Sequence, residues 1–480
     1  MERPLKIRLH VLSPIHIGCD DVYEPTSFVI DEQRKKLIEF DPMDFVKRLK
    51  PQEFTEFSKT AAGDNLLAIF KMIKRFYSKT LAGREVEITD YLVEHYKKIL
   101  KMGTFDKNAV INQFTINKTA FNPQDNTPYI PGTSLKGALR TAYLSALANK
   151  NKIADWKSKA DSLETNLLER EDGKEKMSTD PFRMLKVSDL LPVANVDTKI
   201  FYAVNKKKKL SDKASKAETG PPQIFEAIKS ESVFEGSINV QIPEKGSNIK
   251  NPLKKEDLLK AAQRFYSTIM KDDESLSQII GLNKLSEHLY YTKFSEQLNK
   301  TAFLIRLGRH SGAEAVTIEG NRQIKIIKRP EPLSYATTLW LASDEPKPKS
   351  NNNLLPFGWA VLEVLPFDVR EGIYTAKKQP APQPLLQEAK QETTVSAPTK
   401  KQAPTIISEP ITWENASVVW TPGNQTLKAS KDNQKAEMKV PDKSIVPEQY
   451  HESLFAKKKS VTANITVEKT GNGFKIIKIH

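Results

Sequence analysis

Residues 129–147 read "YIPGTSLKGALRTAYLSAL", a Pro-Gly turn that leads directly into a stretch with helical spacing. Backbone N–H groups at a helix start are unpaired and lie at the positive end of the helix dipole, so they favour an anion. Lys136 and Arg140 are four residues apart and therefore share one face of the first turns. The stretch predicts phosphate binding, which suits a nucleotide cofactor and a nucleic-acid backbone equally well.

The common nucleotide-binding motifs do not fit this loop. In a Walker A motif a glycine directly precedes the lysine and a Ser or Thr follows it, whereas here Gly137 comes after Lys136. A dinucleotide fingerprint fails as well, because no G-x-G-x-x-G opens a strand-turn-helix unit. The alternative that needs no ligand is a tight turn and a helix that only packs, with Thr133 or Ser134 as its N-cap.

The composition is that of a globular protein with a basic surface. Of 480 residues, 39% are hydrophobic and 28% are charged, so the chain is long enough for two or three domains with real cores. Lys and Arg number 74 against 59 Asp and Glu, which gives a net charge of +15. This excess favours a polyanionic partner, and a generally basic surface is the alternative.

Cysteine usage and hydropathy define the expected compartment. Cys19 is the single cysteine, which excludes an internal disulfide framework and a multi-cysteine zinc site. We expect neither a metal nor a cofactor. The N-terminus lacks the apolar stretch of a secretory signal, and no apolar run reaches the ~18 residues that a membrane span requires. These features predict a cytoplasmic protein without membrane contact.

The first segment, "LKIRLHVLS" (residues 5–13), alternates apolar and basic side chains. Such alternation predicts a half-buried strand. Lys6, Arg8 and His10 would then form a basic outer face. Residues 27–40 predict a hairpin.

A helical insertion is predicted at about 41–108. Asp41 would cap its first helix and Pro42 would occupy the first helical position. Residues 109–119 return to strand alternation before the loop quoted first.

Strands and helices mix throughout the rest of the core. Strands are predicted at about 198–204, 235–242, 301–308, 322–328, 337–342 and 358–365, and helices at about 254–270 and 283–299. This order predicts an α+β fold with helices on one face of antiparallel sheets, in two ferredoxin-like units at 1–190 and 191–375. A doubly wound parallel sheet fits less well, because strands and helices do not alternate one for one.

Two segments lack periodicity. Residues 205–222 are basic and rich in turn formers, which predicts a mobile loop. Residues 376–406 are rich in Pro, Gln, Lys and Thr, the composition of a linker. After it, residues 407–480 predict a small β domain, a barrel of possible OB type. Its strands are expected at 417–422, 436–441, 460–469 and 474–480.

A second segment with a glycine, "SPIHIGCDD" (13–21), follows the first strand and contains Gly18. His16 is suited to proton transfer near neutral pH, so it could act as a general acid or base in RNA cleavage. The nearby candidates for a second catalytic group are Asp20, Asp21 and Tyr23. The alternative role for His16 is strand packing or a backbone contact.

A third segment, "RLGRHSGAEAVTIEG" (306–320), also follows a strand. Gly308 and Gly312 would let the backbone approach a ligand closely, while Arg309 and His310 would supply charge and a stacking plane. A glycine-rich hairpin turn explains this segment equally well.

Together, "SPIHIG", "YIPGTSLKGALR", "RLGRHSG" and "PFGWAVLEV" resemble the RAMP superfamily of CRISPR effector proteins. The resemblance covers residues 1 to about 370. Motif order and chain length are most similar to the subunit that caps the crRNA 3′ side of the type III-A (Csm) complex. The C-terminal unit has no counterpart that we can place.

The resemblance implies a pair of RRM-type units that bind crRNA by shape and charge, and a non-catalytic role in crRNA maturation and antiviral interference. The implied partners are crRNA, the backbone RAMP subunit and the small Csm subunit, with target RNA nearby. The residues expected to bind RNA are His16, Gly18, Gly132, Ser134, Lys136, Gly137, Arg140, Gly308, Arg309, His310 and Gly312.

Two other functions stay open at this point. One is a metal-independent RAMP-type endoribonuclease that processes CRISPR RNA with His16 and a nearby lysine or tyrosine. The family's backbone subunits cleave with an aspartate in the loop after the first strand, where this chain has Asp20 and Asp21, but the surrounding sequence departs from their glycine-rich pattern. The other is a basic scaffold for protein contacts.

Overall fold

The computed structural model describes two compact units, which divide at Leu385 and are treated separately. In the first unit the described residues are 3–366, except 64, 79–80, 82, 104–113, 153–159, 172, 209–222, 281–288 and 327–328. In the second they are 411–479, except 422–425, 432–433, 440–445, 457–459 and 471–472. The predicted linker and most of the predicted basic loop therefore lie outside the described residues.

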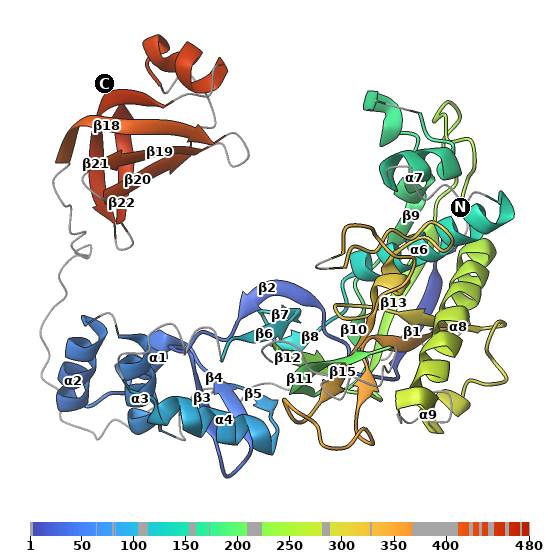
Figure 1. Ribbon diagram of the computed structural model, residues 1–480, viewed down its shortest axis with the longest axis horizontal. Helices are drawn as coiled ribbons and strands as arrows, with labels where there is room; N and C mark the ends of the chain where they lie inside the picture. Colours follow the sequence, from blue (N-terminus) through green and yellow to red (C-terminus); the bar gives the residue numbers. More distant parts are fainter. Residues whose placement is uncertain are drawn as a thin grey trace, which may run out of the picture. The chain divides into compact units, whose positions relative to one another are not determined.

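The first strand of the chain lies in the middle of an antiparallel sheet (Figure 1). The strand order is β10-β13-β1-β17-β14, and β9 also pairs with β13. The bounds are β1 Leu5–Val11, β9 Leu185–Val187, β10 Leu191–Pro192, β13 Val233–Val240, β14 Ala302–Arg306 and β17 Trp359–Val364. Ile7, Leu9 and Val11 are fully buried, so the alternation of the first strand is confirmed.

The outer face of β1 is not the free basic surface that the sequence predicts. Arg8 Nε donates to Glu235 Oε1 at 2.9 Å, and His10 Nε2 lies 2.8 Å from Glu363 Oε2. Both glutamates come from neighbouring strands, β13 and β17. The charge of Arg8 is therefore balanced by Glu235 within the sheet, while burial lowers the pKa of His10, whose ring contacts Glu363.

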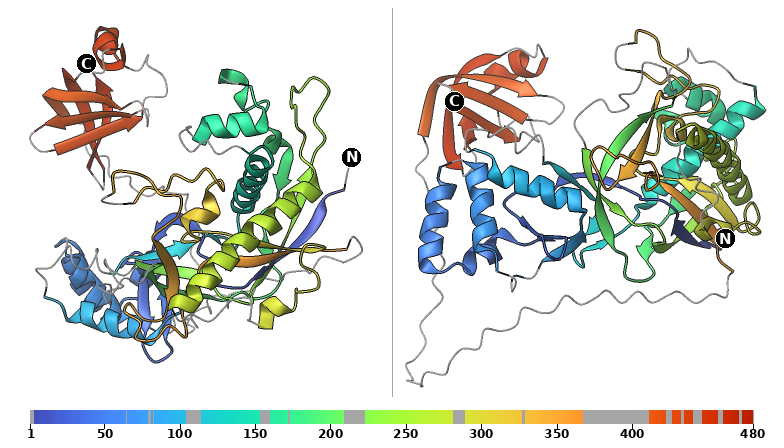
Figure 2. Two further views of the ribbon diagram at one scale, coloured as in Figure 1. Left: turned by 45° about the vertical axis from the view of Figure 1, so that its right-hand side comes forward. Right: turned by 60° about the horizontal axis from the view of Figure 1, so that its bottom comes forward.

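Two helices cover the other face of this sheet. They are α6 (Gly132–Lys150) and α8 (Lys255–Ile280), which lie side by side in Figure 2. Leu135 and Leu139 of α6 are fully buried, and Tyr266 of α8 donates to the carbonyl of Ala138 at 3.2 Å. Across the described ranges, no helix is long and apolar enough to cross a bilayer.

A second, mixed sheet follows the order β2-β6-β12-β11-β5-β4-β3, with β15 and β16 added beside β11. Its bounds are β2 Gly18–Val22, β3 Phe28–Asp31, β4 Lys36–Glu39, β5 Arg84–Glu87, β6 Ile116–Thr119, β11 Thr198–Lys207, β12 Gln223–Ile228, β15 Thr338–Ser343 and β16 Leu355–Pro356. The remaining short strands, β7 (Phe121–Asn122) and β8 (Thr127–Pro128), form a hairpin between β6 and α6. Both large sheets contain strands from each of the two predicted sequence ranges.

The insertion at 41–108 contains the helices α1 (Pro42–Lys47), α2 (Pro51–Ala61), α3 (Leu66–Phe76) and α4 (Asp90–Lys101). Asp41 caps α1 by accepting from the N–H of Met43, as predicted. The insertion is not purely helical, because β5 joins β4 to β11 in the mixed sheet. Phe70 of α3 and Tyr96 of α4 pack against the sheet's core.

Two predicted elements are wrong. A strand is predicted at 322–328, but in its described part, residues 322–326, Ile324 forms only an isolated bridge to Leu333. Of the predicted helix 283–299 the structure describes residues 289–299, in which α9 (Leu289–Thr292) is helical and residues 293–299 form turns and a bridge. The mixed helix-and-strand class itself is confirmed.

The second unit is a closed five-stranded barrel in the order β18-β19-β20-β22-β21. The bounds are β18 Ile411–Thr421, β19 Thr426–Lys431, β20 Gln434–Lys439, β21 Val461–Thr470 and β22 Gly473–Ile479. The third and fifth strands run parallel and the other pairs antiparallel, which is the strand order of an OB-fold. β19 is not among the strands predicted from the sequence, because its residues "TLKASK" have little β propensity.

Candidate nucleic-acid interface

Three of the sequence motifs meet at one edge of the antiparallel sheet, which we call the strand-end junction: residues 13–18 after β1, 307–312 after β14, and 357–358 before β17. The N–H of Arg309 donates to the carbonyl of His16 at 2.8 Å, and that of Gly358 donates to the carbonyl of Pro14 at 2.9 Å. These backbone bonds join segments that are far apart in the sequence.

Two glycines are required for this close approach. Gly308 has φ +81°, and a Cβ there would lie 2.4 Å from the carbonyl oxygen of His16. Gly358 has φ +94°, and its Cβ would lie 2.3 Å from the carbonyl oxygen of Leu307. Any other residue would combine an unfavourable backbone conformation with a clash against backbone atoms.

An aromatic and imidazole cluster lies beneath the junction. The ring of Phe225 on β12 is 4.7 Å from the ring of His16 and 4.8 Å from that of His310. The ring of His310 is also 4.6 Å from that of Trp340 on β15. The junction therefore packs against the mixed sheet and connects the two sheets.

His16 is fully buried, which bears on its predicted catalytic role. Its Nδ1 donates to the carbonyl of Glu226 at 2.7 Å, so Nε2 carries the lone pair, and no partner for Nε2 is found among the described residues. Burial lowers the pKa of His16, and nearby Arg309 lowers it further. A buried neutral imidazole of this kind packs and positions backbone, and it has no open path to an RNA.

His310 lies in a similar environment. Burial, together with Arg309 and His16, lowers its pKa to about 4, so the ring is neutral at physiological pH. Its backbone is left-handed, with φ +63°. Gly312 follows with φ +86° and turns the chain toward Glu314.

Arg309 differs from both histidines. Its side chain is exposed, and within the described residues it has no carboxylate partner. The guanidinium lies 5.4 Å from the centre of the Phe225 ring, which supports one face of it. Arg309 is therefore the cation of the junction that remains available to an anion.

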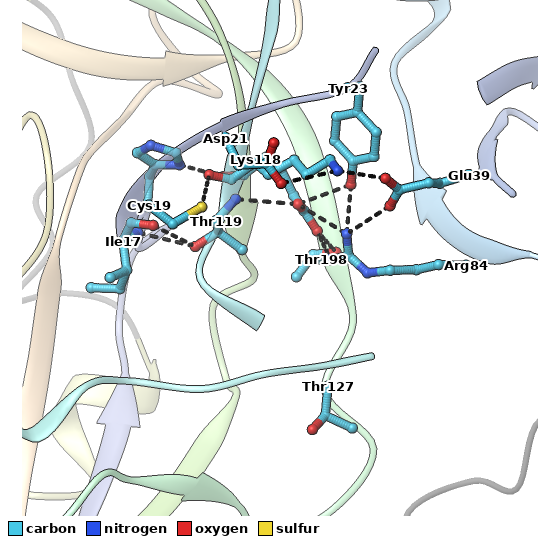
Figure 3. A network of polar contacts seen from close by, with 12 residues as sticks. Ile17, Cys19, Asp21, Tyr23, Glu39, Arg84, Lys118, Thr119, Thr127 and Thr198 are labelled. Carbon is cyan, nitrogen blue, oxygen red and sulfur yellow. Dashed lines mark hydrogen bonds and ion pairs between the residues drawn. The ribbon is translucent and has the colours of Figure 1, made fainter. Parts of the chain in front are cut away.

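A buried polar network supports β2 next to the junction (Figure 3). Its centre is Glu226, a fully buried carboxylate of β12. Thr198 Oγ1 donates to Glu226 at 2.6 Å, Tyr23 OH donates at 2.9 Å, and Arg84 forms a short ion pair with it. Burial alone would lower the pKa of Arg84, but the charge of Glu226 raises it above its ordinary value. This network is not predicted from the sequence; the signal that could have indicated it is the single glutamate in the apolar stretch "QIFEAI".

β2 itself, with Gly18, Asp20 and Asp21, is exposed. Lys118 Nζ lies 3.1 Å from Asp21 Oδ2 and 2.5 Å from Glu39 Oε1, so Asp21 already has a cationic partner. Within the described ranges there is no group of three side chains that could hold a metal ion. Gly18 leaves space beside His16, since a Cβ there would be 3.9 Å from Nε2.

The start of α6 is built differently from the expectation. Pro131 is the N-cap and its own side chain accepts no hydrogen bond, so the prediction of Thr133 or Ser134 as N-cap is wrong. The N–H of Gly132 donates to Asp189 Oδ1 at 2.8 Å, and its Cβ would lie 2.4 Å from the carbonyl oxygen of Val187. An anion does occupy this helix start, but it is a carboxylate of the chain itself.

The two cations of α6 also have partners within the chain. Lys136 Nζ donates to the carbonyl of Leu185 at 2.8 Å, and Arg140 lies 2.6 Å from Glu164 and 2.9 Å from Asp180. This corrects the expectation that both side chains point at one external phosphate. Ser134 is half-buried and its N–H donates to the carbonyl of Pro131. Gly137 is exposed, and a Cβ added to it would meet nothing within 4 Å.

Comparison with curated proteins gives two relatives that share one name, "CRISPR system Cms protein Csm5". The chain is 26% identical over 325 residues to that of Methanocaldococcus jannaschii, covering 64% of this chain and 71% of the relative. It is 28% identical over 272 residues to that of Streptococcus thermophilus, covering 55% of this chain and 70% of the relative.

Solved structures were compared as well. A chain of the cryo-EM structure of a Csm-crRNA-target RNA ternary complex matches with a TM-score of 0.49 and 19% identity, over 75% of this chain and 100% of that one. The crystal structure of T. onnurineus Csm5 matches with a TM-score of 0.44 and 18% identity, over the same shares. Finally, the model of the RAMP superfamily matches residues 8–309. Because this match spans more than half of the 480 residues, the chain belongs to the RAMP superfamily.

Proposed function

We propose that this chain is the crRNA-binding, non-catalytic subunit that caps the crRNA 3′ side of a type III-A CRISPR-Cas (Csm) complex. The family match and the two relatives named Csm5 support this assignment. The observation that carries the RNA-binding part is the strand-end junction, where glycine-rich backbone occurs together with the exposed Arg309, which has no carboxylate partner among the described residues. Phosphate contacts from backbone N–H groups and arginine position an RNA without reading its bases.

The predicted RNA-binding residues then divide by their accessibility. We assign contact through its side chain to Arg309, and contact through the backbone to Gly18, Ser134, Gly137, Gly308, His310 and Gly312. His16, Gly132, Lys136 and Arg140 are buried or bonded within the chain, so their role is to hold these surfaces in place.

The non-catalytic assignment is supported by the burial of His16 and by the ion pair between Asp21 and Lys118. The endoribonuclease alternative needs an accessible imidazole and a second proton-transfer group. The carbonyl of Glu226 bonds to His16 and its carboxylate to Tyr23, but Glu226 and Tyr23 both belong to the buried network.

The proposed function also defines which subunits the chain contacts and in which process it takes part. It would stack on the backbone RAMP subunit of a cytoplasmic complex, near the small subunit and target RNA, and take part in crRNA maturation and antiviral defence. We also propose that the two sheets derive from two ferredoxin-like units whose strands interleave, since helices pack on one face of antiparallel strands in the first sheet.

The test is reconstitution with the other Csm subunits and a CRISPR array. A tagged chain should copurify with the complex and with crRNA, and omission of the chain should leave the RNA 3′ side unprotected against nuclease. The purified chain should not cleave repeat-containing RNA in the presence of a chelator. Cleavage that His16→Ala abolishes would establish the endoribonuclease alternative instead. A chain that neither copurifies with crRNA nor binds RNA would refute the proposal.

A further inference from the structure

A cavity of about 700 Å³ lies between the C-terminal half of α8, the end of β11 and the start of β15. Its apolar wall consists of Ile269, Leu276, Ile326 and Tyr335. The volume falls in the range of cavities that hold a small organic ligand, and the mixture of apolar wall and few charged groups is typical of such sites.

The carboxylates at the cavity wall are largely satisfied by the chain. Glu314 pairs with Lys208 at 2.7 Å and accepts from the N–H of Ala336, also at 2.7 Å. Asp273 pairs with Arg306 at 2.8 Å. Each of these two carboxylates is neutralised by the cation with which it pairs, so the two ion pairs stabilise the cavity wall without adding net charge.

Three cations at the cavity are left over. Within the described residues, Lys207, Arg322 and Arg329 have no carboxylate partner, and Asp272 is the only lining acid without a cation. Arg322 Nη2 makes a long bond of 3.4 Å to the carbonyl of Glu314, and its buried Nε has no hydrogen-bond partner in the part of the chain that the structure describes. The cavity thus offers an excess of positive charge and an unsatisfied buried donor.

We propose that this cavity binds one unstacked nucleotide of a single-stranded RNA, with its phosphate toward Arg322, Arg329 and Lys207. The base would lie among the apolar side chains, with Tyr335 as the aromatic surface. An acidic peptide would satisfy the cations but would leave the aromatic and aliphatic wall without a planar partner. The inference rests on the proposed function, because it takes RNA as the polyanion.

The cavity is connected to the strand-end junction through the chain. Glu314 follows Gly312 by two residues, and Arg306, which pairs with Asp273, is the last residue of β14. If Arg309 binds a phosphate of the RNA backbone, a nearby nucleotide of the same RNA could place its unstacked base in the cavity.

The experiment uses the full chain and two probes, uridine 5′-monophosphate and a short single-stranded RNA with 4-thiouridine at one position. Arg329→Ala/Tyr335→Ala should weaken nucleotide binding, measured by calorimetry, roughly five- to tenfold, the loss of one stacking contact and one charge. The 4-thiouridine should crosslink to residues 322–338, as mapped by mass spectrometry. Tyr335→Phe keeps the ring and should bind as wild type. Lys325→Ala, an exposed cation of the same segment outside the cavity, should also bind as wild type.

The possible failures differ from one another. If tripolyphosphate or a glutamate-rich peptide competes as well as the nucleotide, the site is a general anion site and the inference is wrong. If the double variant binds the probes like wild type while the wild-type chain still binds crRNA, the cavity is not the nucleotide site and the proposed function stands. If wild type binds no RNA at all, alone or in the reconstituted complex, the proposed function itself fails and the inference fails with it.

Discussion

The start of α6 and the strand-end junction look alike in sequence, since each combines glycine, a small polar residue and arginine, but they differ in how their charge is balanced. Arg140 on α6 lies between Glu164 and Asp180, whereas Arg309 at the junction has no acidic partner among the described residues. A basic motif therefore indicates an anion without indicating where the anion comes from. In α6 it comes from the same chain.

The largest effect is expected at Gly308. Gly308→Ala would place a Cβ 2.4 Å from the carbonyl oxygen of His16 at a φ of +81°, which should destabilise the chain by about 3 kcal/mol. Urea unfolding measures this. The matched change on α6 is Gly137→Ala, where nothing lies near and helix propensity should add about 0.5–1 kcal/mol. Equal effects at the two glycines would remove the distinction between the regions.

The second effect tests the internal role of Arg140. Arg140→Ala removes one of the cations that neutralise Glu164 and Asp180. Because the Arg140 and Asp180 side chains are only 23% and 13% exposed, we expect the free energy of unfolding to decrease by about 2 kcal/mol. RNA affinity and its salt dependence should not change. Lys150→Ala, at the exposed end of the same helix, is the control. A stable variant that binds RNA more weakly would restore the original prediction of a phosphate contact.

The third effect is the pH dependence of stability, to which His310 of the strand-end junction contributes in a different pH range from that of Asp180 beside α6. His310 has its pKa lowered to about 4 by burial, so the unfolded chain takes up a proton from about pH 6.5 downward while the folded chain stays neutral. As the pH is lowered from about 6.5 to about 4, the free energy of unfolding should therefore decrease by about 1 kcal/mol per pH unit. His310→Asn, which tolerates the left-handed backbone, should flatten this slope. An unchanged slope would show that the other groups, His16 among them, dominate.

Asp180 titrates in a different range. Burial alone would raise its pKa, but Arg140 and Arg170 lower it below the ordinary value. A lowered carboxyl pKa adds stability above the unfolded value, and this stability is lost as the pH falls through the folded pKa, below about pH 4. Arg140→Ala should flatten only this acid part of a stability-against-pH curve and leave the histidine range intact.

The smallest effect concerns Arg309 and is seen in binding, not in stability. Arg309→Ala should change the unfolding free energy by less than about 0.5 kcal/mol, because the side chain is exposed and its one ring contact is weak. The slope of log affinity for single-stranded RNA against log salt should shrink by about 0.7. A slope equal to that of wild type, and of Lys325→Ala, would contradict the proposed contact.

The sequence by itself determined the local elements and the broad chemistry. The alternation in 5–11, the cap at Asp41 and the separate C-terminal barrel follow from side-chain periodicity and turn residues, which act within a few positions along the chain. Glycines after strands likewise indicated the junction, because φ and steric needs are local. The superfamily membership could be inferred from these motifs together.

Only the tertiary structure decided which charges are free. Asp180 and Asp189 reach α6, Glu235 reaches Arg8, and Glu226 reaches Arg84 from positions that no local pattern connects. β5 and residues 322–326 show the same limit for strands, since a strand forms only where another edge accepts its hydrogen bonds. Ion pairs and sheet ladders form between segments distant in sequence, so the availability of Arg309 and the occupation of Arg140 depend on the fold.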